Sequence, residues 1–289
     1  MAWTRKKKAW IGILSVIVLV IIIFLIVEHL QGPSGDRIGV VEIEGVISGS
    51  KEVMDDIVDF KDDASIKGVI LRINSQGGGV GPTQEIYREV VKLTEKKKVY
   101  VSMGTTCASG GYYIASAGQK LYANPSTITG SIGVIMELMN VEDVLKKIGL
   151  KSNTIKAGEY KDTGSPFRPM TPEERAYMDG IVTNIYDQFT KDVATGRKMN
   201  VETVKKLAEG RIYTGTMAKD VGLVDAIGNF YDTVDAMKAD LRIKGKPVLV
   251  YPEKPFSLVR WIFGVVGHDF TRELANQLAS SPFKFLMAQ

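Results

Sequence analysis

The sequence predicts an α/β protein built on a parallel β-sheet and preceded by one N-terminal transmembrane helix. Short runs rich in Val and Ile alternate with helical patterns, which is typical of repeated βα units. Two glycine-rich segments, 76–79 and 108–111, each lie between a predicted strand and a predicted helix. Because ligands of parallel sheets bind beyond the carboxyl ends of the strands, both segments are candidate parts of a site.

Composition limits the possible functions. With 289 residues, 45% of them hydrophobic and 24% charged, the chain is typical of a globular protein of one or two domains. Residues 28–289 hold 33 basic and 33 acidic side chains, so they lack the basic excess of a nucleic-acid-binding protein. Cys107 is the single cysteine, which excludes an intramolecular disulfide, and with only His29 and His268 a metal site is not expected.

Residues 9–27 form an uncharged stretch of 19 residues rich in Ile, Val and Leu. As a helix, a stretch of this length crosses the roughly 30 Å hydrocarbon core of a bilayer. It is longer than the apolar region of a signal peptide and no Ala-x-Ala cleavage site follows it, so we expect an uncleaved single-pass anchor. Arg5, Lys6, Lys7 and Lys8 precede it, which predicts a cytoplasmic N-terminus and an extracytoplasmic body. The alternative is a buried core helix.

The first half of the body is predicted to alternate between strands and helices. A flexible linker rich in Gly, Ser and Pro occupies residues 31–35. After it we expect strands at 38–43, 68–73 and 99–103, and helices at 51–63, 83–94 and 110–117. Loops are expected at 74–79 and 105–108, after the second and third strands.

The second half is predicted to be mostly helical. Thr171 is followed by Pro172 and, three residues on, by Glu174, a pattern typical of a helix start with a capping box. This helix should run to about residue 195, after an irregular loop at 158–172. The remaining expected elements are helices at 141–148, 200–208, 216–219 and 231–241, and strands at 152–156 and 247–251.

Three regions follow from these patterns. Residues 1–30 contain the basic segment and the anchor, residues 36–251 the α/β domain, and residues 252–289 a hydrophobic tail. The tail is rich in aromatic and aliphatic side chains from Phe256 on. It suits either contact with a partner surface or a helix packed on its own domain, and both alternatives stay open.

Ser109 is the first candidate catalytic residue. It lies at a predicted loop-to-helix junction, and its small neighbours let another backbone approach closely. Unpaired N–H groups at such a junction can stabilise the oxyanion that forms when a serine attacks a carbonyl group. The alternative is a serine that only caps the helix. The segment is not the G-x-S-x-G motif of α/β-hydrolases, because Cys107 occupies the first glycine position.

A nucleophilic serine needs a base. His29 follows the anchor and His268 lies in the tail, so neither belongs to the α/β body. A lysine is the remaining familiar base, and it acts only in its neutral form, which requires burial away from carboxylates. Lys161 follows the predicted strand 152–156 and precedes a proline-containing loop, a position compatible with a cleft. The alternative is a solvated loop lysine.

The chain resembles the signal peptide peptidase A family in its short, membrane-anchored form. The resemblance rests on five segments in order: 72–79 (RINSQGGG), 100–104 (YVSMG), 108–115 (ASGGYYIA), 129–134 (TGSIGV) and 156–162 (KAGEYKD). It extends from Ile38 to about Leu241. The family usually has proline before the glycine run, where this chain has Gln76, which alters loop stiffness but leaves the glycines intact.

The resemblance implies a Ser-Lys peptidase of family S49 with the ClpP/crotonase-like fold, acting without metal, nucleotide or organic cofactor. Ser109 would be the nucleophile, Lys161 the general base, and Ser131 a hydroxyl that orients the lysine. Backbone N–H groups of Gly78 and of the Ser109 turn, Gly110 included, would form the oxyanion hole. The resemblance also implies a homo-oligomeric ring in which neighbouring subunits share each active site.

We therefore expect a membrane-anchored serine endopeptidase that degrades cleaved signal peptides and other membrane-associated peptides. Because signal peptides are apolar, the S1 and S3 subsites should be hydrophobic. One alternative is a catalytically silent membrane scaffold. Another is an acyl-CoA hydratase or isomerase of the crotonase-like fold, although an extracytoplasmic body would be separated from cytoplasmic CoA.

Overall fold

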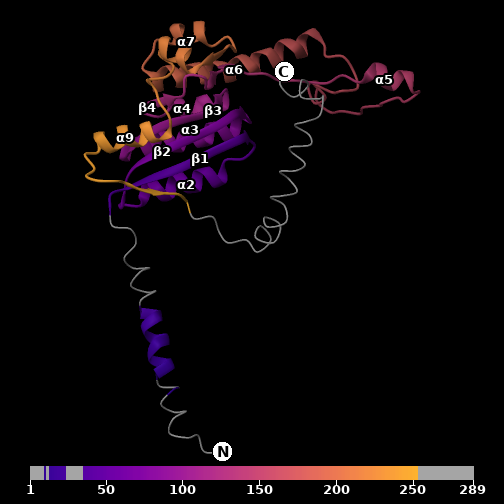
Figure 1. Cartoon of the computed structure of the whole chain (residues 1–289). Coiled ribbons are helices and arrows are strands. Elements are labelled where there is room, and N and C mark those ends of the chain that lie inside the picture. Colours follow the sequence, from indigo (N-terminus) through magenta and orange to yellow (C-terminus); the bar gives the residue numbers. More distant parts are fainter. Residues whose placement is uncertain (1–9, 11–12, 24–34, 253–289) are drawn as a thin grey trace, which may run out of the picture. The chain divides into compact units, whose positions relative to one another are not determined.

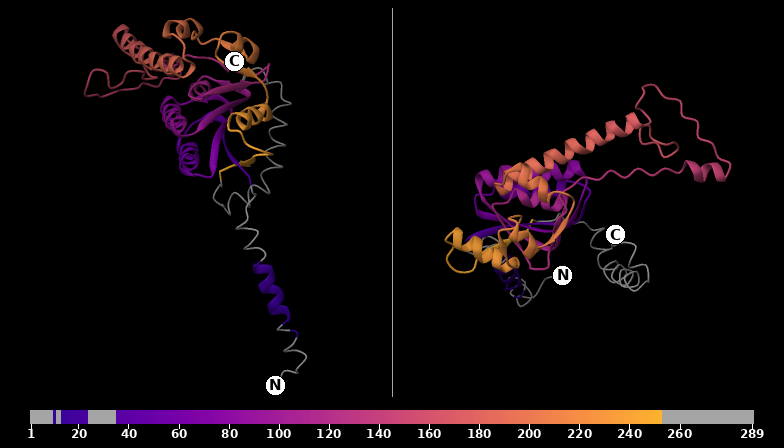
Figure 2. Two further views of the ribbon diagram at one scale, coloured as in Figure 1. Left: turned by 90° about the vertical axis from the view of Figure 1, so that its left-hand side faces the viewer. Right: turned by 90° about the horizontal axis from the view of Figure 1, so that it is seen from above.

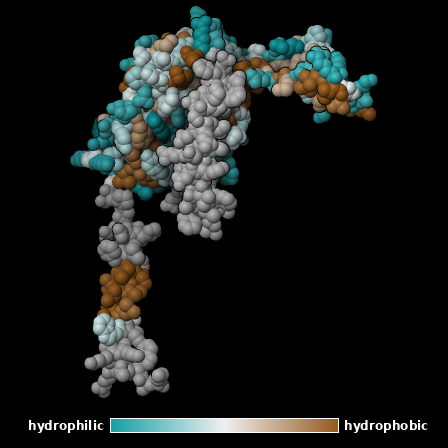
Figure 3. Space-filling view, turned by 45° about the vertical axis from the view of Figure 1, so that its right-hand side comes forward, coloured by the Kyte–Doolittle hydropathy of each residue, from teal (hydrophilic) through white to brown (hydrophobic). Residues whose placement is uncertain are grey.

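A computed structural model describes residues 10, 13–23 and 35–252 of the chain (Figure 1). Residues 13–23 form an exposed, mostly apolar helix, brown in Figure 3. Within the described residues, no helix is both long and apolar enough to cross a membrane. The remainder of the predicted anchor, the tail from residue 253, and the two histidines lie outside the described residues.

A β-sheet of eight strands forms the centre of the α/β body. The strands are β1 (Arg37–Ile47), β2 (Ile66–Gly78), β3 (Lys98–Ala108), β4 (Lys120–Ala123), β5 (Ile128–Gly130), β6 (Ile212–Thr214), β7 (Ala226–Ile227) and β8 (Val248–Val250). The main path runs β6-β5-β3-β2-β1-β8, and β4 pairs with β3 and β7. All pairs are parallel except β5 with β6, so the predicted parallel sheet is confirmed.

Helices cover both faces of this sheet. One face carries α2 (Lys51–Asp62), α3 (Val80–Lys96) and α4 (Gly110–Ser116), and the other carries α9 (Phe230–Asp240) (Figure 2). The larger core joins Ile57 and Ile86 of the first group to strand residues such as Leu71. A smaller core joins Met237 of α9 to Tyr100. The central strands are therefore buried on both sides, which explains their continuous apolar runs.

The carboxyl ends of the central strands meet at one edge of the sheet. Ile47 at the end of β1 pairs with Gly78 at the end of β2, and Ser75 of β2 pairs with Cys107 of β3. Both glycine-rich segments therefore lie at this edge, as expected for a parallel sheet.

The second half contains α5 (Glu142–Lys147), α6 (Pro172–Arg197), α7 (Val201–Leu207) and α8 (Gly215–Asp220). The long helix α6 begins where predicted, with Pro172 in its first turn. The capping box is confirmed, because Glu174 N donates to Thr171 Oγ1 at 3.2 Å and Thr171 N donates to the Glu174 carboxylate at 2.9 Å. Along α6 the chain runs from the segment that carries α5 to the α/β body (Figure 1).

Three sequence-based expectations differ from the structure. The predicted strand at 152–156 is wrong: these residues pair with no described strand and are exposed, and a strand without a partner is not stable in water. Residues 105–108, expected as a loop, continue β3 because Cys107 pairs with both Ser75 and Thr129. The expected loop at 74–79 is mostly strand as well, since β2 continues to Gly78. Strands β4 to β7 were not predicted, because they are too short to show a periodic pattern in the sequence.

Gly196 lets α6 approach the end of α4, and its replacement should destabilise the fold. A Cβ atom at this position would lie 2.0 Å from the carbonyl oxygen of Ser116. Gly196→Ala should therefore lower the free energy of unfolding by about 3 kcal/mol, as overpacking does. At Gly180, on the same helix, a Cβ atom would extend into open space, so Gly180→Ala should raise that free energy by about 1 kcal/mol.

Urea denaturation of the two variants measures the difference. Equal effects of both substitutions would contradict a close contact between α6 and α4.

Candidate active site

Ser109 occupies a strained turn between β3 and α4. Its backbone angles are φ 51° and ψ −120°, a region that residues with a side chain rarely adopt and that active sites often contain. Its side chain makes no capping hydrogen bond to α4, so Ser109 does not act as a simple helix cap. A sharp strand-to-helix turn of this kind exposes the nucleophile of α/β-hydrolases, although their sequence motif is absent here.

Backbone contacts hold this turn in place. Ser109 N donates to the Gly130 carbonyl at 2.8 Å, and Tyr113 N donates to the Ser109 carbonyl at 2.9 Å. Gly77, with φ 102°, lies so close that a Cβ atom there would be 2.7 Å from Gly110 N. Both the positive φ and the lack of space therefore require glycine at position 77.

A cavity of about 480 Å³ opens beside Ser109. Three other predicted site residues line it: Gly78, Gly110 and Ser131. The remaining lining residues are Val80, Thr83, Tyr113, Gly133, Val134, Ile135, Ile185, Tyr186, Phe189, Ala208, Glu209 and Gly210. The cavity thus joins the end of β2, the Ser109 turn, the segment after β5, one part of α6 and the segment after α7.

Gly78 and Gly110 contribute backbone to this cavity. A Cβ atom on Gly78 would lie 2.2 Å from the carbonyl oxygen of Ile47, so only glycine fits beside β1. The N–H groups of the first turn of α4 have no partner within the helix. Gly78 and Gly110 line the same cavity as Ser109, and unpaired backbone N–H groups near a serine suit the stabilisation of an oxyanion.

Ser131 follows β5 and also has a positive φ, 51°. Its backbone N donates to the Arg211 carbonyl at 2.8 Å, which fixes the turn after the strand. Within the part of the chain that the structure describes, neither the Ser131 nor the Ser109 hydroxyl has a protein hydrogen-bond partner. Both hydroxyls can therefore interact with a ligand or an incoming base.

Lys161 does not line this cavity. It lies between α5 and α6 in consecutive turns, in which Lys161 N donates to the Gly158 carbonyl at 3.3 Å and Thr163 N to the Tyr160 carbonyl at 3.2 Å. Lys161 is exposed, and no carboxylate of the described residues forms an ion pair with it. A single chain therefore brings together four of the five predicted site residues and leaves the lysine apart from them.

Aromatic side chains that the sequence analysis did not select form part of the cavity wall. The rings of Tyr113 and Phe189 stack with their centroids 4.5 Å apart. The Tyr113 hydroxyl also donates to Asp192 of α6, and burial together with this carboxylate raises the pKa of Tyr113. Phe189 stands four residues after Ile185, and this helical spacing was the available signal for one apolar face of α6.

Cys107, two residues before Ser109, is fully buried. Burial raises the pKa of its thiol, so the side chain stays protonated and acts as a small apolar core residue, as expected. Among the residues for which side chains are described, no group of three or more His, Cys, Asp or Glu could hold a metal ion.

Two family models match the chain. The model of peptidase family S49 matches residues 91–252, and the model of Clp protease matches residues 46–130. The first match contains Ser109, Ser131 and Lys161, and the second contains Gly78 and Ser109. Together with the mixed α/β sheet, the second match supports the expected ClpP-like fold.

Relatives occur in archaea and bacteria. A putative protease of Methanocaldococcus jannaschii is 40% identical over 67% of this chain and 62% of its own length. A putative protease of Synechocystis is 41% identical over 68% of this chain and 71% of its own. A putative signal peptide peptidase SppA of Enterococcus faecium is 35% identical over 76% of this chain and 68% of its own.

The strain at Ser109 leads to a test of stability. Glycine adopts φ 51° and ψ −120° without the steric conflict that a Cβ atom causes. Ser109→Gly should therefore have a free energy of unfolding about 1 kcal/mol higher than Ser109→Ala. Both variants lack the hydroxyl, so their comparison in urea denaturation isolates the backbone effect. A Ser109→Gly variant less stable than Ser109→Ala would show that the turn is not strained.

Proposed function

Because the chain belongs to peptidase family S49, we propose that it is a membrane-anchored serine endopeptidase with a dyad of Ser109 and Lys161. Its substrates would be cleaved signal peptides and other membrane-associated peptides. One observation carries the proposal: a serine in a strained strand-to-helix turn shares a cavity with the backbone of Gly78 and Gly110. This is the arrangement that acyl transfer to a serine requires.

In the proposed reaction, neutral Lys161 removes the proton from Ser109 Oγ, which attacks the carbonyl carbon of the peptide bond. The N–H groups of Gly78 and Gly110 stabilise the negative charge on the carbonyl oxygen. As the C–N bond breaks, the Lys161 ammonium returns its proton to the leaving amine. A water molecule, deprotonated by Lys161, then attacks the ester carbonyl of the acyl-enzyme. As the ester C–O bond breaks, the Lys161 ammonium returns the proton to Ser109 Oγ, and the Ser131 hydroxyl would orient the lysine throughout.

A lysine from a neighbouring subunit is part of this proposal. The loop of Lys161 contacts Glu174 through Arg168, whereas the α6 residues of the cavity begin at Ile185. Ile185 lies eleven positions after Glu174 on the helix, which corresponds to a rise of about 16 Å. This separation favours a site in which one chain supplies Ser109 and its neighbour supplies Lys161.

Exposed apolar side chains also support an assembly. The segment between β5 and α6 exposes large hydrophobic residues, which gather at the end of α6 distant from the sheet (Figure 3). They include Leu138, Met139, Ile148 and Ile155. Apolar surface of this kind marks contact sites, and a homo-oligomeric ring would bury it.

Apolar peptide substrates fit the walls of the cavity. Val80, Ile135, Ile185 and Phe189 provide aliphatic and aromatic contacts close to Ser109. Hydrophobic S1 and S3 subsites would accept the side chains of signal peptides, and an anchor at residues 9–27 would keep the enzyme where such peptides remain. The N-terminus would be cytoplasmic and the catalytic domain extracytoplasmic.

Labelling with a fluorophosphonate tests the nucleophile and the base. The full-length protein in detergent should be labelled, whereas Ser109→Ala should not. Lys161→Ala should remain folded and lose about a hundredfold or more in kcat/KM, the usual contribution of a general base. Lys151→Ala, which removes another exposed lysine of the same segment, should keep wild-type activity. An unlabelled wild type would favour the silent scaffold, and a fully active Lys161→Ala would eliminate the lysine base.

Coexpression of two inactive variants tests the shared site. If Ser109→Ala and Lys161→Ala chains assemble at random, each site has a probability of about one half for either intact group, so about a quarter of the sites recover both. Mixed oligomers purified through a different tag on each chain should show that fraction of wild-type activity. Mixed oligomers without activity would place both groups in one chain.

A further inference from the structure

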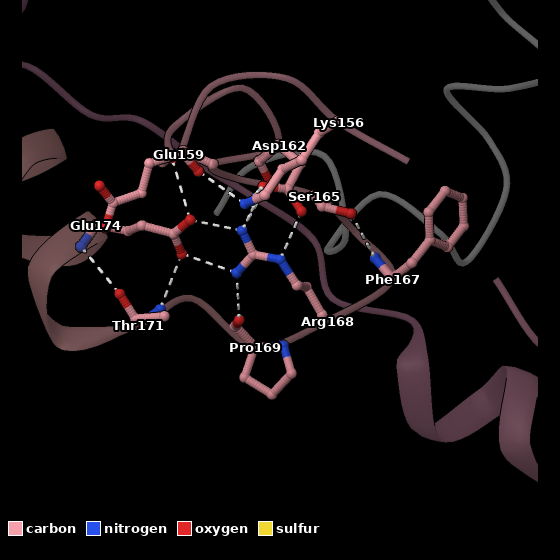
Figure 4. A network of polar contacts seen from close by, with 10 residues as sticks. Lys156, Glu159, Asp162, Ser165, Phe167, Arg168, Pro169, Thr171 and Glu174 are labelled. Carbon is pink, nitrogen blue, oxygen red and sulfur yellow. Dashed lines mark hydrogen bonds and ion pairs between the residues drawn. The ribbon is translucent and has the colours of Figure 1, made fainter. Parts of the chain in front are cut away.

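Arg168 lies at the centre of a charged network in the loop that carries Lys161 (Figure 4). Its guanidinium lies between the carboxylates of Asp162 and Glu174, and Lys156 also pairs with Asp162. The side chains are shielded from solvent, with exposed fractions of 30% for Arg168, 13% for Asp162 and 6% for Glu174. Arg168 is therefore fixed on both sides.

The contacts to Asp162 hold both its side chain and its backbone. Arg168 Nε donates to Asp162 Oδ2 and Nη2 to Asp162 Oδ1, both at 2.8 Å. Nη2 also donates to the main-chain carbonyl of Asp162 at 3.3 Å. Since Asp162 follows Lys161 directly, these contacts to its side chain and main chain restrict the turn in which the lysine lies.

The contacts to Glu174 attach this turn to α6. Arg168 Nη1 donates to Glu174 Oε2 at 2.8 Å and Nη2 to Oε1 at 2.5 Å. The same carboxylate accepts hydrogen bonds from Thr171 N at 2.9 Å and from Thr163 Oγ1 at 3.2 Å. Because Glu174 belongs to the capping box, the loop is joined to the first turn of a long helix.

The network also determines which cations pair with the carboxylates of Asp162 and Glu174. Arg168 and then Lys156 hold the pKa of Asp162 well below its usual range. Arg168, followed by the Thr171 N–H, lowers the pKa of Glu174 to about 2. Both groups are therefore ionised and paired at neutral pH, and Asp162 is already engaged instead of pairing with the adjacent Lys161. A lysine base needs such freedom from a carboxylate partner.

We propose that Arg168 is a positioning residue for the peptidase reaction. It holds the Lys161 turn on α6 and keeps the Asp162 carboxylate engaged away from the lysine. The inference rests on the proposed function, because it assumes that Lys161 is the base. Arg168 is not among the residues that line the cavity, so its removal should affect the chemical step and leave substrate binding unchanged.

Steady-state peptide hydrolysis by the full-length protein in detergent tests this role. Arg168→Ala should lower kcat by about tenfold or more, with KM within about twofold of wild type, because a displaced base reacts poorly. Arg168→Lys should recover only part of kcat, since an ammonium cannot bridge two carboxylates as a guanidinium does. Arg175→Ala is the matched control: Arg175 pairs with Asp179 on the exposed surface of α6 at 3.1 Å, and its removal should leave kcat unchanged.

Lys161→Ala is measured in the same assay. If it is inactive while Arg168→Ala keeps wild-type kcat, the inference is overturned and the proposed function stands. A fully active Lys161→Ala overturns both. A higher KM with unchanged kcat in Arg168→Ala would assign the network to substrate binding and also overturn the inference.

A second variant decides the matter if Arg168→Ala does not fold. Glu174→Gln keeps an oxygen for the capping box and removes the charge that faces Arg168. A loss of about threefold or more in kcat supports the inference, because a misplaced base slows the chemical step. An unchanged kcat overturns it.

Discussion

The close approach of two backbone segments, 77–78 at the end of β2 and 109–110 at the start of α4, is the constraint on which the site depends. A Cβ atom at Gly77 would contact Gly110 N, and one at Gly110 would lie 2.7 Å from Thr83 Oγ1. Without side chains in this contact, the two segments can line one cavity together with Ser109. The strained backbone of Ser109 persists because β3, the strand that precedes it, is held in the sheet by β2 on one side and β5 on the other.

The proposed nucleophile and the proposed base are held in place by different kinds of interaction. The Ser109 turn is held by the hydrogen bond from Ser109 N to the Gly130 carbonyl and by its neighbours Cys107 and Tyr112, which pack in the larger core. Lys161 lies in a loop without strands, whose order comes from arginine–carboxylate contacts at the start of α6. The same helix lines the cavity further along, at Ile185 and Phe189. The position of α6 therefore affects both regions, because its first turn holds the Lys161 loop and its later residues line the cavity.

Local sequence patterns predicted correctly those helices and strands that can be recognised from their own residues. The capping box at Thr171 and Glu174 requires only four consecutive residues, and the buried strands read as continuous apolar runs. The strand predicted at 152–156 is wrong because a strand also needs a neighbouring strand to pair with, and none of the described strands pairs with it. At residues 105–108 the error is the reverse: a loop was predicted, but pairing with β2 and β5 extends the strand β3 beyond the point where its apolar pattern ends.

The alternation of strands and helices, the two glycine-rich segments and a serine beside one of them are visible in the sequence, because these features depend on neighbouring residues. The folded structure was needed to show that Ser131, Thr83 and Phe189 share a cavity with Ser109, since they come from separate elements. It was also needed to show that Lys161 lies apart from that cavity in its own chain. Neither result can be read from local patterns, because the distances between segments far apart in the chain are fixed by how the helices pack on the sheet.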